Sequence, residues 1–382
     1  MKDLPLISIV GNNWFPDKPG GLDRYIYELT YTLSTLETNV SLYGLGLPSD
    51  SGQVSIHLHN LADPAQTLYR RLLSVYRATK PLAIADSDAI NIHFALNGLP
   101  TLPHLPKDVP VTCTFHGPWA IESQAEGDSK ASVWFKRQVE ALVYRRCDRF
   151  IVLSKAFGEI LHHEYGIPWE KIHIIPGGVD IQRFQNNLSR QQAREKLHWP
   201  QDRFILFTPR RLVHRMGLGP LLSAIAQLET HQQEVWLAIA GRGTLRETLE
   251  RQATELGLSH QVKFLGFLPD EQLPIAYQAA DLTIMPSQSL EGFGLVLLES
   301  LASGTPTLCT PVGGMPEVIT NFSPDLITVS TTDQAIASTL TDILTGSIAL
   351  PDREACRAYA VNNFNWKAIA QRVKATLLDT ST

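Results

Sequence analysis

The segment "EGFGLVLLES" (291–300) places two carboxylates at a spacing that could hold two parts of one elongated ligand. Glu291 precedes a Gly-Phe-Gly step, and Glu299 follows within an aliphatic run that is typical of a helix. Carboxylates accept hydrogen bonds from vicinal hydroxyls, as they do from the ribose of bound dinucleotides. A loop glutamate and an unrelated glutamate on a solvated helix face are the alternative, and the neighbouring segments decide between the two.

Three arginines follow the expected strand "FILFTPR" (204–210), in the segment "RRLVHRMG". Arg210, Arg211 and Arg215 could form either a solvated basic turn or an anion site. Because a guanidinium fork binds phosphate oxygens bidentately, arginines at the end of a strand favour a diphosphate. The glycines of the Gly-Phe-Gly step are expected in the first turn of the following helix, where bare N–H groups also bind phosphate.

Two features of the N-terminal half also come directly after expected strands. Pro19, Gly20 and Gly21 form a loop before the helical pattern "LDRYIYELTYTL" (22–33), and such a loop presents N–H groups to an anion. His116 ends the strand "VTCTFHG" (111–117) and could hydrogen-bond a sugar hydroxyl or a developing charge. A plain turn and a structural histidine remain the alternatives.

Weaker signals occur elsewhere. "IAGRGTLRETLE" (239–250) contains Gly241 in a Gly-x-Gly step after a strand, but it lacks the full dinucleotide fingerprint. "PGGVD" (176–180), in which Asp180 could cap a helix or bond a ligand, is equally well explained as a turn. "DSD" (86–88) resembles a metal clamp, yet it precedes a strand, so we interpret it as a turn and expect neither metal nor cofactor.

Short apolar runs rich in β-branched residues alternate with helical patterns along the chain. Runs without polar alternation suit parallel strands that are covered on both faces. The predicted fold class is therefore α/β, with two doubly wound, Rossmann-like domains that face a cleft. The expected strands are 6–11, 40–45, 89–94, 111–117, 148–154, 204–210, 235–241, 262–267, 282–287 and 306–311.

A length of 382 residues favours two domains. The polar segment 185–200 interrupts the alternation of strands and helices, and we place the seam there. The predicted N-terminal, acceptor-binding domain covers 1–188 and is completed by a C-terminal helix at about 365–382. The predicted C-terminal, nucleotide-sugar-binding domain covers 189–364.

Composition narrows the class of protein. A hydrophobic content of 44%, a charged content of 19% and a net charge of −5 describe a soluble protein and argue against a nucleic-acid partner. The four cysteines lie far apart without zinc or redox spacing, which favours reduced thiols. The N-terminal apolar run is short for a signal peptide, and no apolar window has the length of a membrane span. We therefore expect a cytoplasmic protein.

Together these segments resemble the retaining glycosyltransferases of family 4, the group 1 transferases with the GT-B fold, over nearly the whole chain. The most specific part is the Glu-x7-Glu pattern, in register with "RRLVHRMG" and "PGGVD". "FNWKAIAQRV" (364–373) is similar to the family's closing helix, which returns to the N-terminal domain. The resemblance implies transfer of a hexose from a nucleoside diphosphate sugar to a hydroxyl of a glycan, lipid carrier or small molecule. A UDP-sugar is favoured as the donor, and a GDP-sugar is the alternative.

The resemblance also implies roles for individual residues. Glu291 would bind the donor sugar, and Glu299 would bind the nucleotide ribose. Arg211 would stabilise the leaving diphosphate, with Arg215 as a further catalytic candidate, and His116 would touch the transferred sugar. The other implied donor-binding residues are Gly20, Gly21, Arg210, Gly241, Gly266, Leu268, Gly292, Phe293, Gly294 and Leu295.

One position departs from the family pattern. Members usually have a lysine where this chain has Met216, just before Gly217. Methionine cannot neutralise a phosphate, and Arg215 could substitute only from a different direction. Two functions therefore stay open: a retaining, metal-independent hexosyltransferase, and a catalytically weak or inactive sugar-nucleotide-binding subunit. An epimerase of the same fold is less favoured because no matching motif is present.

Two basic segments with aromatic residues, 66–80 and 130–149, raise the hypothesis of peripheral contact with an anionic membrane at its cytoplasmic face. The alternative is that both are helices that cover their own sheet, with the arginines in solvent.

Overall fold

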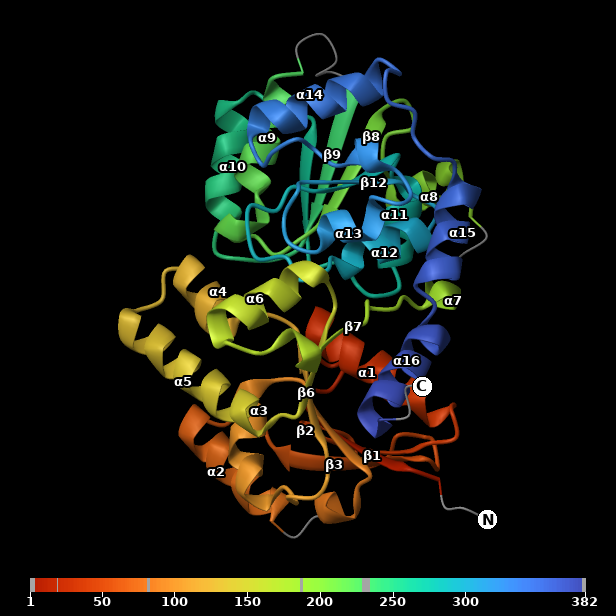
Figure 1. The fold of residues 1–382 in the computed structure, drawn as a ribbon. Helices are drawn as coiled ribbons and strands as arrows, with labels where there is room; N and C mark the ends of the chain where they lie inside the picture. Colours follow the sequence, from red (N-terminus) through yellow and green to blue (C-terminus); the bar gives the residue numbers. More distant parts are fainter. Residues whose placement is uncertain (1–3, 19, 81–82, 186–187, 229–233, 380–382) are drawn as a thin grey trace. The chain divides into compact units, whose positions relative to one another are not determined.

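The computed structural model describes residues 4–18, 20–80, 83–185, 188–228 and 234–379. The chain divides into two compact units, Met1–Gly178 with Trp366–Thr382, and Val179–Asn365. In each unit, helices lie on both sides of a parallel sheet (Figure 1).

The sheet of the N-terminal unit has the order β3-β2-β1-β4-β5-β6-β7, and all its pairings are parallel. From β1 the chain first builds towards β3 and then returns to place β4 on the other side of β1, so strand order reverses between β1 and β4. In doubly wound folds, ligands bind at the carboxyl ends of the strands that flank such a reversal. The strands are β1 Leu6–Asn13, β2 Asn39–Leu45, β3 Ile56–Ala62, β4 Ala89–Ile92, β5 Val111–Phe115, β6 Arg149–Val152 and β7 Ile172–Ile174.

The helices of this unit bury apolar faces against the sheet. Val75 of α2 and Val143 of α5 are fully buried in the same cluster as Ile90 and Ile92 of β4. On the closing segment of the chain, α16 packs against α1, and the Trp366 ring lies 5.1 Å from that of Tyr25. The helices are α1 Gly21–Ser34, α2 Leu68–Thr79, α3 Ala95–Gly98, α4 Trp119–Ala125, α5 Lys130–Arg146, α6 Lys155–Tyr165 and α16 Trp366–Leu378.

The sheet of the C-terminal unit has the order β10-β9-β8-β11-β12, again with parallel pairings, and its strand order reverses between β8 and β11. The strands are β8 Phe204–Pro209, β9 Val235–Ala240, β10 Val262–Gly266, β11 Leu282–Met285 and β12 Thr307–Cys309. The helices are α7 Ile181–Phe184, α8 Arg190–Leu197, α9 Leu218–Ala226, α10 Arg246–Glu255, α11 Leu273–Ala279, α12 Leu295–Ala302, α13 Met315–Ile319, α14 Asp333–Leu344 and α15 Arg353–Asn363.

The division between the units falls after Gly178, whereas the sequence places the seam after residue 188. The intervening segment joins the second unit because Asp180 caps α7, Arg183 pairs with Asp270 at 2.6 Å, and the Phe184 ring lies 5.9 Å from that of Tyr277. Residues 186–187 of the expected seam lie outside the described residues.

All the strands expected from the sequence are present, several ending two residues early, and the predicted α/β class with two doubly wound parallel sheets is confirmed. Two further strands were missed. β3 is an edge strand in which His57, His59 and Asn60 interrupt the apolar pattern, and β7 has only three residues. Among the helices of the described ranges, none is long and apolar enough to cross a membrane.

Candidate active site

The segments that follow β8 and β11 meet at the strand-order reversal of the C-terminal unit. Arg210 comes directly after β8, and Ser287 comes two residues after β11. The Arg210 guanidinium donates from Nη2 to the Ser287 hydroxyl and to Oε2 of Glu291, and the same hydroxyl donates to Glu291 at 3.1 Å. The predicted arginine and glutamate therefore lie together, joined by a serine that the sequence analysis did not identify.

Glu291 is a buried anion held by cations. Burial raises the pKa of its carboxyl, but the Arg210 charge and hydrogen bond, with smaller contributions from Arg215 and Ser287, outweigh burial and hold the pKa below its usual value. Glu291 is thus ionised at neutral pH. A buried charge of this kind persists only with well-formed partners.

Arg215 lies in the short 3-10 turn His214–Met216 and is 8% exposed. Its Nη1 donates to the backbone carbonyl of Leu290 at 3.0 Å, and its own carbonyl accepts from the Gln288 amide at 2.8 Å. Leu290 has a left-handed backbone with φ of 55°, which is uncommon for a residue with a side chain. Such conformations persist where the surroundings fix them, commonly at binding sites.

Glycines lock these loops by close backbone approach. A Cβ on Gly217 would lie 1.7 Å from the Pro286 carbonyl oxygen, and one on Gly313 would lie 1.9 Å from the Glu291 carbonyl oxygen. That same Glu291 oxygen accepts from the Gly314 amide at 2.9 Å. The Gly-Gly step after β12 therefore positions Glu291, a role that the sequence analysis missed although "PVGGMPE" follows a strand.

The three arginines differ in their surroundings. Arg210 and Arg215 are buried, whereas Arg211 is exposed. Met216, at the position where the family usually has lysine, is 5% exposed and belongs to the apolar core. The cations next to Glu291 are thus Arg210 and Arg215, each of which lies one position before a residue of the family pattern, Arg211 and Met216.

Glu299 lies inside α12 and is 9% exposed. Its Oε2 accepts a hydrogen bond from the Tyr277 hydroxyl of α11 at 2.6 Å. The helix begins at Leu295 after Gly294, whose φ is 85°, and Phe293 is buried. The expectation that Gly292 opens the first helical turn is wrong, because the left-handed Gly294 already ends the preceding loop.

The loops after β9 and β10 contain the other expected donor-binding residues. A Cβ on Gly241 would lie 1.9 Å from the Arg210 carbonyl oxygen, so the fold itself requires glycine there. The Gly241 amide donates to the Gly266 carbonyl at 2.6 Å, and Leu268 is half-buried. Gly241 therefore has a structural explanation that needs no ligand.

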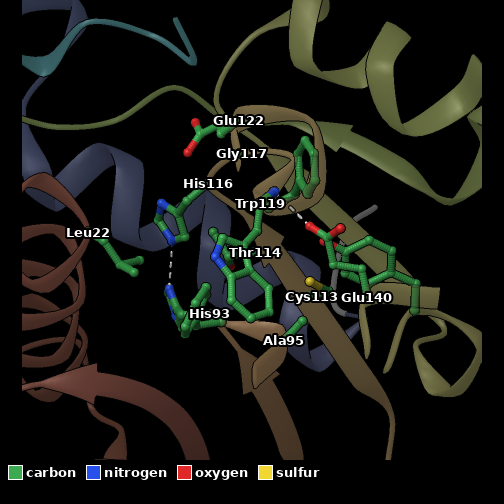
Figure 2. A pocket seen from close by; sticks show the side chains of 13 residues that line it. Leu22, His93, Ala95, Cys113, Thr114, His116, Gly117, Trp119, Glu122 and Glu140 are labelled. Carbon is green, nitrogen blue, oxygen red and sulfur yellow. Dashed lines mark hydrogen bonds between the residues drawn. The ribbon is translucent and has the colours of Figure 1, made fainter. Parts of the chain in front are cut away.

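In the N-terminal unit, a cavity of about 170 Å³ lies at the carboxyl ends of β4 and β5 (Figure 2). His93 follows β4, and its amide donates to the Val10 carbonyl of β1 at 3.0 Å, so it lies at the strand-order reversal. His116 follows β5, as predicted. The remaining lining residues are Leu22, Phe94, Ala95, Cys113, Thr114, Phe115, Gly117, Trp119, Glu122, Glu140 and Tyr144.

The two histidines face each other in this cavity, with His93 Nδ1 2.9 Å from His116 Nε2 (Figure 2). Burial lowers the pKa of His116 to about 3, and burial together with His116 holds the pKa of His93 well below its usual value. Both imidazoles are therefore neutral at physiological pH.

The glycine loop before α1 has space around it. The helix begins at Gly21, and a Cβ there would meet no described atom within 4 Å, while one on Gly20 would lie 3.5 Å from Asp23. Pro19 lies outside the described residues. In contrast, a Cβ on Gly178 would lie 2.6 Å from the Trp366 ring, so that glycine of "PGGVD" has a packing role.

Within the part of the chain that the structure describes, no group of three His, Cys, Asp or Glu side chains could hold a metal ion. The "DSD" residues have local roles, because Asp88 accepts from the Leu6 amide at 2.8 Å and Ser87 bonds the Ser8 hydroxyl at 2.6 Å.

Two of the known proteins that are similar to this chain are named as a glycosyltransferase and a mannosyltransferase. The D-inositol 3-phosphate glycosyltransferase of Corynebacterium jeikeium is 32% identical over 74% of this chain and 70% of that protein. The GDP-mannose-dependent alpha-(1-6)-phosphatidylinositol monomannoside mannosyltransferase of Mycolicibacterium smegmatis is 30% identical over 55% of this chain and 57% of that protein. The chain spans only about half of the length of several of the relatives that it matches.

A solved structure and two family models also match this chain. Anabaena HepE in complex with UDP and glucose has a TM-score of 0.75 to this chain at 19% identity, covering 98% of this chain and 100% of that one, which supports a common fold. Residues 19–183 match Glycosyltransferase Family 4, and residues 189–379 match Glycosyl transferases group 1. The chain therefore belongs to the group 1 glycosyltransferases and has their two-domain, Rossmann-like GT-B fold.

Proposed function

We propose that the protein transfers a hexose from a nucleoside diphosphate sugar to a hydroxyl acceptor. The observation that carries this proposal is the buried cluster of Arg210, Arg215 and Glu291 at the strand-order reversal of the C-terminal unit. Cations held in place where a diphosphate departs can stabilise the charge that develops there, and one preorganised contact contributes roughly 3 kcal/mol.

In this proposal each acidic side chain has its own part of the donor. Glu291 accepts hydrogen bonds from the sugar hydroxyls through the carboxylate oxygen that Arg210 and Ser287 leave free to bond further. Glu299 accepts from the ribose while Tyr277 holds its other oxygen. Arg215, together with the N–H groups at the start of α12, faces the diphosphate. These groups supply the positive charge that a lysine at position 216 usually supplies in the family.

The nature of the donor is argued from relatives. HepE has been solved with UDP and glucose, and the Mycolicibacterium relative is named as GDP-mannose-dependent. We favour a UDP-hexose, with a GDP-hexose as the alternative. The acceptor is a hydroxyl of a glycan, a lipid carrier or a small molecule.

We further propose that transfer retains the anomeric configuration and needs no metal. Inverting and retaining hydrolases both need a pair of carboxylates across the scissile bond. In this cluster Glu291 is engaged by Arg210, so the leaving diphosphate rather than a carboxylate would take the acceptor proton on the same face. Proton NMR of the anomeric centre of the product tests retention, and unchanged turnover in EDTA tests metal independence.

Nucleotide release provides the main test. The protein is incubated with UDP-, GDP- and ADP-hexoses and mixed hydroxyl acceptors, alongside Glu291→Gln and the exposed control Glu255→Gln. Release from one donor that is lost only in Glu291→Gln supports the transferase. Donor binding without release supports the second candidate, an inactive sugar-nucleotide-binding subunit, which the buried Met216 favours. Neither binding nor release from any donor contradicts both.

Peripheral membrane contact is a separate proposal. The outer faces of α2 and α5 expose aromatic residues, with Tyr69 77% and Trp134 64% exposed, among Arg70, Arg77 and Arg145. The inner faces cover the sheet, as the alternative interpretation expects. Flotation with anionic and with neutral liposomes tests the contact: binding to anionic vesicles that Trp134→Ser weakens supports it, and no binding to either contradicts it.

A further inference from the structure

A chain of hydrogen bonds runs from the buried sheet to the cavity of the N-terminal unit, and the orientation of the Asn91 amide sets its direction. The Thr114 hydroxyl donates to Oδ1 of Asn91 at 2.9 Å. The amide nitrogen of Asn91 then faces Nε2 of His93, also at 2.9 Å. Because an amide nitrogen can only donate, His93 Nε2 must accept with its lone pair.

A neutral imidazole has one N–H group, so the proton of His93 lies on Nδ1. That nitrogen faces Nε2 of His116 and donates to it. His116 Nε2 therefore also accepts, and the one proton of His116 lies on its Nδ1. Tautomers of histidine are fixed in this way by the hydrogen bond that the other ring nitrogen makes.

The chain ends at the cavity. Thr114, Asn91 and His93 are almost completely buried, whereas His116 is partly exposed. Figure 2 shows the second ring nitrogen of His116 turned away from His93, on the side of the cavity where Glu122 lies. Within the described residues, this nitrogen has no hydrogen-bond partner.

We propose that His93 is a positioning residue, aligned by Asn91 and Thr114, that fixes His116 as a neutral donor with its Nδ1–H group directed at a ligand oxygen. His116 then cannot act as a general base, because one ring nitrogen is protonated and the other is engaged. The ligand group that it meets is a neutral hydroxyl or ether oxygen, as in a sugar, because carboxylates of Glu122 and Glu140 line the same cavity and disfavour an anion. Only the assignment of that oxygen to a sugar rests on the proposed function.

Long-range 1H–15N NMR of histidine-labelled, full-length protein without ligand reads the tautomers directly. Thr114→Val removes the first donor of the chain. Thr112→Val is the matched control, because Thr112 lies on the same strand and its buried hydroxyl has no hydrogen-bond partner among the described residues. Wild type and Thr112→Val are expected to show His93 and His116 protonated on Nδ1 alone, and Thr114→Val is expected to show mixed tautomers.

Two variants of His93 separate positioning from packing. In His93→Asn the amide nitrogen occupies the position of Nδ1 and still donates to His116, whereas His93→Gln keeps a group only at the position of Nε2. His116 should stay protonated on Nδ1 in the first variant and lose that preference in the second. With an active donor sugar, His93→Gln should raise KM about tenfold with little change in kcat, since one neutral hydrogen bond contributes roughly that factor to binding.

The proposal is overturned if wild-type His116 is protonated on Nε2 or on both nitrogens at neutral pH, or if Thr114→Val and Thr112→Val give the same spectra as wild type. These spectra need no substrate. A failure of the donor screen together with the expected tautomers would therefore count against the proposed reaction and not against the hydrogen-bond chain.

Discussion

The two units place a candidate ligand site at the same point of their topology, the reversal of strand order, yet the chemistry of the two sites is opposite. In the C-terminal unit the site is ionic, with Arg210, Arg215 and an ionised Glu291. In the N-terminal unit the site is centred on two neutral imidazoles, His93 and His116, whose pKa values are lowered by burial. The topology of each sheet thus positions a candidate site, and the charges of the side chains distinguish the two sites.

The comparison also separates two uses of glycine. Gly217, Gly241 and Gly313 are required by the fold, because a Cβ on any of them would overlap a backbone carbonyl of a neighbouring loop. Gly21 has open space around it and no such requirement. The first group keeps the ionic site rigid, whereas the described part of the fold places no such constraint on Gly21.

The largest expected effect breaks the ionic site through its backbone. Gly217→Ala combines a φ of 71° with a Cβ 1.7 Å from the Pro286 oxygen, so the free energy of unfolding should fall by more than about 3 kcal/mol. Gly21→Ala should change it by less than about 0.5 kcal/mol. Urea denaturation measures both, and equal midpoints would show that the loops after β8 and β11 are not locked together.

The next effect concerns charge. Glu291→Gln keeps the shape of the side chain but removes the anion that pairs with Arg210, so turnover should fall by about a hundredfold or more, as for loss of one preorganised charge contact. The matched control is Glu255→Gln at the end of α10, which is exposed. Steady-state nucleotide release gives the comparison, and a loss of less than threefold would remove Glu291 from the site.

The neutral site should show itself in the dependence of stability on pH. An unfolded histidine binds a proton below about pH 6.5, whereas the lowered pKa values keep His93 and His116 neutral in the folded protein. The unfolded state then binds more protons, so stability falls as the pH drops below 6.5, by at most about 1.4 kcal/mol per pH unit for each histidine.

His93→Asn removes one of the two groups and serves as the internal control. Its stability, followed by thermal or urea unfolding between pH 7 and pH 5, should fall less steeply than that of the wild type, by at most about 1.4 kcal/mol per pH unit. A flat profile for the wild type would show that these imidazoles are already protonated or solvated in the folded state.

The smallest effect sharpens the role of Glu299. Tyr277→Phe removes the hydroxyl that donates to Glu299 and should cost about 1 kcal/mol of stability. If Glu299 binds ribose, nucleotide affinity should also fall severalfold, because the carboxylate loses the partner that orients it. Calorimetric titration measures this, and unchanged affinity in the presence of measurable binding would place the ribose elsewhere.

Sequence alone pointed to Arg210 and Glu291, which the structure brings into contact, but not to the details of their surroundings. Arg210 and Arg211 are adjacent, and successive residues at a strand end point to opposite sides, so the pattern could not tell which would be buried. Burial selects Arg210. Ser287 was missed because its role comes from joining Glu291 to Arg210, which lies 77 positions away in the chain. Tyr277 was missed because it reaches Glu299 from the neighbouring helix α11.

The neutral site was less predictable for the same reason. His116 stood out because it ends an expected strand, whereas His93, Asn91 and Thr114 look like ordinary strand residues. Their hydrogen-bond chain exists because β4 and β5 are neighbours with Asn91 opposite Thr112 in register. The apolar runs, by contrast, predicted the strands well, because burial on both faces leaves a signal in each run by itself.

The most direct test of the ionic site compares a nucleoside diphosphate with its monophosphate by calorimetry, in the wild type and in Arg215→Met. We predict that UDP or GDP binds the wild-type protein at least tenfold more tightly than UMP or GMP, and that Arg215→Met abolishes this difference while leaving the monophosphate affinity unchanged. Equal affinities for diphosphate and monophosphate in the wild type, or a difference that Arg215→Met preserves, would contradict the assignment of the diphosphate to this site.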